Sequence, residues 1–246
     1  MNRRALIIYC DDTSSEKLKG PIADNRNLIR HLRSNLGGDW HNHEIHSLQN
    51  PTKAQVQSEI RSHLNEADYS FIVYSGHGGT NTITNKIDLE LQDGDITLNS
   101  LVLTSVDRQT IILDACRTHY TPSERKAFMN VYDGLESFSE ELSTRSLFES
   151  LVLDCEKGVT VLCAAGDNEA AADNLNGAPY LSSLIKVCSD WKNVNQIDNK
   201  LSLKSAHEKA IIYMREKYIT TQNPEILAEK RKKYYPFAVK FVPIMG

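Results

Sequence analysis

The fold of this chain is decided by two stretches, Ser75-Gly76-His77-Gly78-Gly79 and Leu113-Asp114-Ala115-Cys116-Arg117. Each stretch overlaps or directly follows a short apolar run, 69–74 in the first case and 110–113 in the second, with the length and composition of a buried strand. In a parallel sheet with helical crossovers, the carboxyl ends of the strands meet at one edge, where α/β proteins place their sites. We therefore expect the histidine and the cysteine to lie together at that edge.

The rest of the chain alternates strand-like and helix-like segments. Short apolar runs alternate with segments whose apolar residues recur at helical spacing. This order predicts an α/β fold in which a mostly parallel central sheet has helices on both faces. The strands are expected at 5–10, 43–48, 69–74, 110–113, 159–165 and 237–242, and the helices at 22–36, about 52–64, about 98–106, 180–190 and 202–218.

Composition excludes several classes of protein. The 246 residues are 40% hydrophobic and 24% charged, which is enough apolar material for the core of one sizeable domain. The formal net charge of -4 predicts no binding to nucleic acid, and the basic run 230–233 is interpreted as a solvated patch. No apolar run approaches the roughly 18 residues of a membrane span. Asp11 and Asp12 follow the first apolar run too early for a signal peptide, so we expect a cytoplasmic protein.

Cys116 differs from the other cysteines in its flanking sequence. The chain has five cysteines, and Cys10, Cys163 and Cys188 lie in apolar segments that predict reduced core residues. A thiol becomes a strong nucleophile when an imidazole accepts its proton or stabilises its thiolate. His77 and Cys116 therefore predict a catalytic dyad, whereas each motif alone also fits a buried cysteine or a turn histidine.

The glycines beside His77 suit the same chemistry. Without side chains, they let a substrate backbone approach closely. The main-chain N–H of Gly78, together with that of Cys116, is predicted to form an oxyanion hole for the scissile carbonyl. His119, three residues beyond the nucleophile, is a second candidate base that we place below His77 because its segment is expected to be mobile.

These paired motifs resemble those of the caspase-like cysteine peptidases, which include caspases, metacaspases and bacterial relatives (orthocaspases). Segments 18–24, 222–224 and 236–239 extend the resemblance over most of the chain. The resemblance implies a caspase-like sandwich formed by one domain, 1–246. Within it, 1–117 corresponds to the large subunit, 118–146 to a linker and 147–246 to the small subunit.

The residue two positions before the nucleophile carries information about specificity. Caspases have glutamine there and a cationic pocket for aspartate, whereas this chain has Asp114. A carboxylate in a desolvated pocket repels aspartate and attracts arginine or lysine. In the metacaspase branch two further pocket residues match Ser75 and Asp24, so the resemblance implies cleavage after a basic P1 residue. For Asp24 a purely structural role at a helix N-terminus remains an alternative.

The linker contains basic residues of its own. If the enzyme cleaves after arginine or lysine, Arg125, Lys126 and Arg145 are candidate positions for self-processing. The chain also departs from the metacaspase pattern, because Arg117 follows the nucleophile where histidine is usual. This departure suggests a bacterial-type or divergent member.

No cofactor is expected to be required. Many metacaspases bind calcium, and candidate oxygen ligands lie in the loop after His77 and just beyond Cys116. Because six or more ligands must converge, a solvated acidic loop is the favoured interpretation. No metal site is predicted at the histidines of 41–46 either, since strand geometry sends His43 and His46 to opposite faces. The candidate calcium ligands are Asp88, Glu90, Asp93 and Asp95, with Thr121, Ser123 and Glu124.

The leading hypothesis is thus a cysteine endopeptidase that acts on proteins or peptides. The resemblance implies a role in stress, cell death or defence beside an activating or regulatory protein partner. One alternative is a catalytically silent caspase-fold scaffold that binds a partner, and another is a related hydrolase with a different specificity. Neither the oligomeric state nor the physiological substrate follows from the residues.

Overall fold

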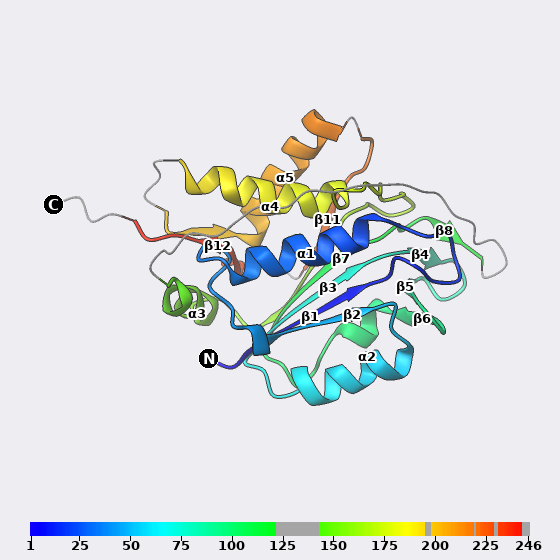
Figure 1. The fold of residues 1–246 in the computed structure, drawn as a ribbon, viewed down its shortest axis with the longest axis horizontal. Coiled ribbons are helices and arrows are strands. Elements are labelled where there is room, and N and C mark those ends of the chain that lie inside the picture. The colour runs from blue at the N-terminus through cyan, green and yellow to red at the C-terminus, as the bar shows by residue number, and fades with distance from the viewer. Residues whose placement is uncertain (122–142, 195–197, 219, 229–230, 243–246) are drawn as a thin grey trace.

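The computed structural model describes residues 1–246 except 122–142, 195–197, 219, 229–230 and 243–246 (Figure 1). A central sheet of six strands has the order β11-β9-β7-β3-β1-β2. Its strands are parallel except β11, which pairs antiparallel with β9. These strands are β1 (Arg3–Tyr9), β2 (Ile45–Gln49), β3 (Tyr69–Ser75), β7 (Arg108–Asp114), β9 (Gly158–Cys163) and β11 (Glu225–Ala228).

One face of the sheet is covered by helices. Alternate side chains of the inner strands, such as Ala5 and Ile7 of β1, point into a core cluster with residues of four helices. In Figure 1 these helices lie above and beside the sheet. They are α1 (Gly20–Arg33), α3 (Arg145–Leu153), α4 (Pro179–Lys192) and α5 (Leu203–Tyr218).

The opposite face is covered by α2 (Lys53–Glu59, continued by the turn Ile60–Leu64) and a smaller sheet. Leu6 and Ile8 of β1 point into this second core cluster. The smaller sheet has the order β6-β5-β4-β8 and extends from the carboxyl ends of β3 and β7 (Figure 1). Its strands are β4 (Gly78–Asn81), β5 (Lys86–Leu91), β6 (Gly94–Thr97) and β8 (His119–Tyr120), and a separate pair is β10 (Lys200–Ser202) with β12 (Pro236–Val239).

The expected fold class is confirmed, with differences at particular segments. The six expected strands and the helices around 22–36, 52–64, 180–190 and 202–218 are present with shifted ends. The helix expected at 98–106 is only the short turn Leu98–Leu101, because Val102 is extended. Strands β4, β5 and β6 lie around the segment 80–100, for which the sequence predicts only a loop or a hairpin, and helix α3 was not expected. Strands β8, β10 and β11 were not expected either, since their two to four residues give too short a pattern to detect.

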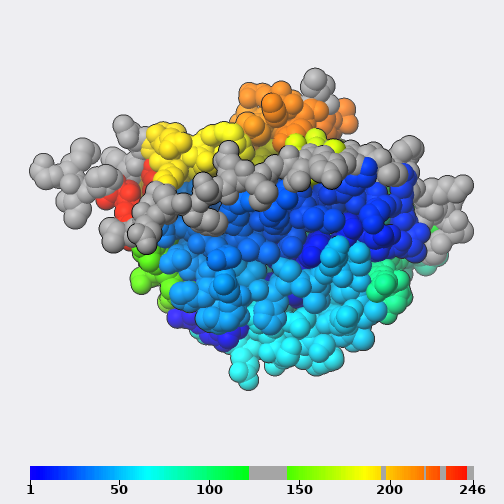
Figure 2. All heavy atoms as spheres, in the orientation of Figure 1, coloured from blue at the N-terminus to red at the C-terminus, as the bar shows by residue number. Residues whose placement is uncertain are grey.

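The space-filling view shows how closely these layers pack (Figure 2). Blue and cyan atoms of the N-terminal segments cover the strands that are visible in Figure 1. Within the described residues, no helix combines the length and the apolar character that crossing a membrane requires.

Gly38 offers a test of the packing between the end of α1 and α3. Its φ of 99° disfavours any side chain, and a Cβ there would lie 2.4 Å from the ring of buried Phe148. We expect Gly38→Ala to destabilise the protein by about 2 kcal/mol or more, since backbone strain and overpacking add. Thermal unfolding should show a larger loss than in Gly94→Ala, whose φ of 113° is similar but whose nearest neighbour is the flexible Lys53 Nζ at 3.0 Å. Equal losses would contradict this account.

Candidate active site

The register between β3 and β7 sets the geometry of the site. Ser75 is the register partner of Asp114, and the Gly76 N–H donates to the Asp114 carbonyl at 3.2 Å. His77 and Cys116 each lie two residues beyond this pair. Because β3 and β7 are adjacent and parallel, they bring His77 and Cys116 to the same edge of the sheet.

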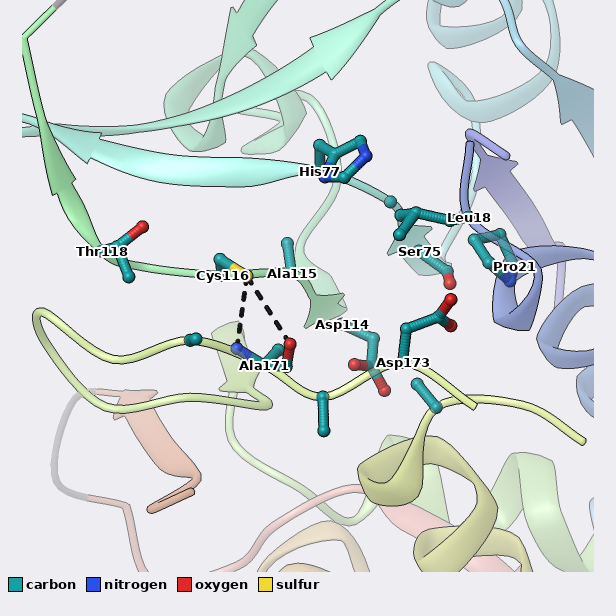
Figure 3. Close-up of a pocket in the computed structure, with 14 residues that line it drawn as sticks. Leu18, Pro21, Ser75, His77, Asp114, Ala115, Cys116, Thr118, Ala171 and Asp173 are labelled. Atoms are coloured by element: carbon teal, nitrogen blue, oxygen red, sulfur yellow. Dashed lines mark hydrogen bonds between the residues drawn. The ribbon is translucent and has the colours of Figure 1, made fainter. Parts of the chain in front are cut away.

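A cavity of about 460 Å³ opens at this edge, and both His77 and Cys116 line it (Figure 3). Leu18 and Pro21, at the start of α1, form another part of its wall. The small side chains of 170–172 form a further part and leave room for a peptide. Its volume is within the usual range for sites that enclose a ligand.

The thiol of Cys116 is accessible, unlike those of the other four cysteines, which are all buried. Burial raises the pKa of both Cys10 and Cys163 to about 12, which keeps them protonated. The Ala171 N–H donates to Cys116 Sγ at 3.3 Å, and the thiol donates to the Ala171 carbonyl at 3.6 Å. A donor aimed at sulfur stabilises the thiolate, which is the nucleophilic form.

The imidazole of His77 is oriented by a main-chain carbonyl. Its Nε2 lies 2.5 Å from the carbonyl oxygen of Glu16. Because a carbonyl can only accept a hydrogen bond, Nε2 carries a proton and Nδ1 is the basic nitrogen of the neutral ring. The hydrogen bonds drawn in Figure 3 join Cys116 to Ala171, so the thiol is held by the 170–172 segment in this conformation.

The main chain of Gly78 is oriented as an oxyanion hole requires. The Glu90 N–H donates to the His77 carbonyl, which makes Gly78 and Leu89 a non-hydrogen-bonded pair of the antiparallel ladder. The Gly78 N–H therefore points away from β5, to the side on which the Thr80 N–H donates to Thr118. A Cβ on Gly78 would lie 3.0 Å from that of Ala115, so glycine also permits this close approach to the cysteine segment.

Three predicted pocket residues lie together. Ser75 and Asp114 line the cavity, and the Ser75 hydroxyl donates to Asp24 at 2.7 Å. Burial, opposed by the hydrogen bond from the Leu181 N–H and assisted by the charge of Asp173, raises the pKa of Asp114 to about 7. Burial and the nearby Asp114 also raise the pKa of Asp24 well above its usual range.

Asp173 is a further carboxylate that lines this cavity, and no sequence motif indicated it. Its two oxygens accept from the N–H groups of Lys19 and Gly20 at 3.1 and 2.9 Å, so it joins the 166–178 loop to the start of α1. Figure 3 shows its side chain beside Asp114 and Ser75. Its place in a loop after a strand was the available signal, because such loops meet at the same sheet edge. Glu16 and Ala171 act through main-chain atoms, which no side-chain pattern reveals.

His119 is not among the residues that line the cavity, and its side chain contacts Asp167 instead. Its Nε2 lies 3.1 Å from Asp167, and the pair is exposed. Arg117 is buried and donates to Glu225 of β11 at 2.5 Å and to the Ala165 carbonyl at 3.2 Å. Arg117, the residue after Cys116, thus joins the end of β7 to the edge strand β11.

The acidic loop residues have different hydrogen-bond partners. Asp88 accepts from Tyr120, whereas Glu90 accepts from Ser14 and Ser15. Asp93 accepts from the Lys53 N–H at the start of α2. Among the described residues, no group of three or more histidine, cysteine or acidic side chains converges in a way that suits a metal ion.

The candidate self-processing positions differ in their surroundings. Arg125 and Lys126, like Ser123 and Glu124 among the calcium candidates, lie outside the described residues. Arg145 begins α3 and pairs with Glu44 through both terminal nitrogens, at 2.8 and 2.5 Å. A peptidase needs an extended substrate segment, so this helical, ion-paired arginine is a poor cleavage position and we leave it out of the proposal below.

Comparison with known proteins identifies the family. The model of the caspase domain family matches residues 2–235, and the chain belongs to this family. The family membership makes it a protein of the cysteine-peptidase kind, with proteins as the implied substrates. No sequence among curated proteins is similar enough to count as a match.

Solved structures share the fold at low sequence identity. Caspase-1 from Spodoptera frugiperda has a TM-score of 0.63 and 11% identity, over 97% of this chain and 90% of that one. Protein GSU0716 from Geobacter sulfurreducens has a TM-score of 0.62 and 16% identity, over 97% of this chain and 99% of that one. These likenesses support the caspase-like fold.

The raised pKa of Asp114 predicts a pH-dependent stability. An aspartate with a folded-state pKa of about 7, against an unfolded value of about 4, favours folding when protonated and loses that contribution as pH rises from about 4 to 7. Asp114→Asn should therefore unfold at a higher temperature than the wild type at pH 8 and at a similar temperature at pH 4. Asp107→Asn, which removes an exposed carboxylate, is the matched control for net charge. A higher unfolding temperature for the wild type than for Asp114→Asn at pH 8 would contradict the predicted direction of this effect.

Proposed function

We propose that this protein is a cysteine endopeptidase that cleaves after arginine or lysine through a His77–Cys116 dyad. The observation that carries the proposal is the cavity itself, which is lined by Cys116, by the oriented His77 and by the buried carboxyl group of Asp114. Acyl transfer needs a nucleophile, a base and an oxyanion donor at one site. The cavity residues supply candidates for each.

The proposed mechanism follows from the orientation of His77. Cys116 Sγ attacks the scissile carbonyl carbon, and its proton passes to Nδ1 of His77 and then to the leaving amine. The N–H groups of Gly78 and Cys116 stabilise the oxyanion, where single donors are worth roughly 3–4 kcal/mol in other enzymes. His77 then deprotonates a water that hydrolyses the thioester, which releases the acid and restores the thiol.

The acidic side chains support a basic P1 residue. Asp114 and Asp173 line the cavity and Asp24 contacts it through Ser75, so a cationic side chain would be attracted there. Without a substrate, burial disfavours the ionised forms of Asp24 and Asp114. A cationic side chain that enters the pocket favours these ionised forms. On the basis of this pocket, we propose that the protein belongs to the metacaspase branch of the family and is of the bacterial type.

Hydrolysis of fluorogenic peptides tests the activity and the specificity together. The peptides differ only in P1, which is Arg, Lys, Gln or Asp, and are assayed with and without calcium. We expect Cys116-dependent release after Arg and Lys, with kcat/KM reduced about 100-fold or more in Asp114→Asn because the charge-assisted contact is lost. The wild-type kcat/KM should rise from pH 6 to 8 as the pocket carboxylates ionise.

The controls separate the parts of the proposal. Cys116→Ala must be inactive on every peptide, and Asp107→Asn must match the wild type. Cleavage after Asp would refute the pocket assignment while retaining the nucleophile. Inactivity of the wild type on all peptides would instead favour the catalytically silent scaffold.

We also propose self-processing at Arg125 or Lys126. Both residues fall in the segment that the family resemblance assigns to the linker, and both present the side chain that the proposed pocket accepts. Purified wild type is expected to yield two fragments on incubation, whereas Cys116→Ala and an Arg125→Ala/Lys126→Ala double variant stay intact. Mass spectrometry of the fragments locates the cut. The same fragments from Cys116→Ala would contradict the proposal.

A further inference from the structure

Glu90 is a buried carboxylate for which the proposed mechanism has no role. It lies on β5 with no exposed surface. A charged group in such a place is costly unless several hydrogen bonds compensate it. The hydrogen-bond partners of the Glu90 side chain therefore indicate which part of the chain this carboxylate stabilises.

Three hydrogen bonds to its side chain come from one segment of the chain, the loop between β1 and α1. Oε1 of Glu90 accepts from the Ser14 hydroxyl and from the Ser15 N–H, both at 2.9 Å. Oε2 accepts from the Ser15 hydroxyl at 2.6 Å. A single carboxylate thus holds two successive residues of a loop that is distant in sequence.

The next residue of this loop is Glu16, whose carbonyl accepts from His77 Nε2 at 2.5 Å. The main chain of Glu90 also contacts His77, because its N–H donates to the His77 carbonyl. The Tyr74 hydroxyl oxygen lies 2.6 Å from the carbonyl oxygen of His77 and 2.7 Å from that of Glu90, so its one proton is shared between these two acceptors. Hydrogen bonds, together with the peptide bonds of the loop, therefore connect Glu90, Ser14, Ser15, Glu16 and His77 in a closed circuit.

We propose that Glu90 is a positioning residue that orients the His77 imidazole by holding Ser14 and Ser15. With the loop held, the Glu16 carbonyl keeps the proton on Nε2 and leaves Nδ1 to receive the thiol proton and pass it to the leaving amine. The Glu90 side chain does not line the cavity, so its proposed action passes through the loop. This proposal rests on the peptidase function proposed above.

The test uses two substrates with the same P1 arginine, a peptide amide and an activated peptide ester. Protonation of the leaving group matters for an amine and little for a good leaving group. Ser14→Ala/Ser15→Ala removes the two hydroxyl donors from the partly exposed loop and leaves the core intact. We expect kcat/KM to fall about tenfold or more for the amide and at most about threefold for the ester.

Three variants complete the series. Glu90→Ala should give the same amide-selective loss, whereas Glu90→Gln should retain most activity, since its oxygen accepts from Ser14 and its amide can donate to the Ser15 hydroxyl. Asp12→Ala is the matched control, because it alters the same loop at an exposed residue whose side chain pairs with Lys17. Equal losses on amide and ester, or no loss in the double variant, would overturn the proposal.

A spectroscopic measurement separates this proposal from the peptidase function. In protein with ¹⁵N-labelled histidine, the ring nitrogens of His77, assigned by their absence in His77→Gln, report which nitrogen carries the proton. We expect the Nε2–H form in the wild type and a mixture of tautomers in Ser14→Ala/Ser15→Ala, even if no substrate is cleaved. An unchanged tautomer in the double variant would overturn the positioning role.

Discussion

The pairing of β3 with β7 is the constraint on which the rest of the site depends. Seven parallel register pairs end at Ser75 and Asp114, and the chain then diverges from the central sheet on both strands. One branch becomes β4, with His77 just before it, and the other carries Cys116 toward β8. If one strand slipped by one residue, all its side chains would move to the opposite face of the sheet, and His77 and Cys116 would be separated. Both strands pack their side chains into both core clusters, so a slip of one residue would disturb the packing on each face of the sheet.

Burial of acid groups beside the nucleophile opposes stability. The folded protein disfavours the ionised forms of Asp24 and Asp114, as their raised pKa values indicate. The 166–178 loop adds Asp173 to the same region and is itself anchored by hydrogen bonds to the start of α1. Buried carboxylates of this kind lower the stability of a protein without a ligand, and they would favour the binding of a cation. Such groups are typical of binding sites, where residues needed for function are kept although they reduce stability.

The site also requires the C-terminal part of the chain. Arg117 joins the strand of the nucleophile to Glu225 on β11, and Gln222 accepts from the Ala172 N–H at 3.1 Å. Asn223 donates to Glu169 through its main chain and its side chain, at 2.8 and 2.6 Å. These contacts hold the loop that places Ala171 against Cys116. The fold thus needs residues from both sides of 122–142 to complete one cavity.

The fold class and the paired strand ends could be predicted from the amino-acid sequence. So could the proximity of five side chains, those of His77, Cys116, Ser75, Asp24 and Asp114. Apolar periodicity and short motifs suffice for this, because they act over a few neighbouring residues. It missed β8, β10 and β11, whose patterns are too short, and it included Arg145, which an ion pair with Glu44 holds at the start of a helix. Only the tertiary structure decided which carbonyl orients His77, which loop holds Cys116, and that Glu90 contacts Ser14 and Ser15. Those contacts join segments far apart in the chain, many through main-chain atoms, so no local pattern of side chains encodes them.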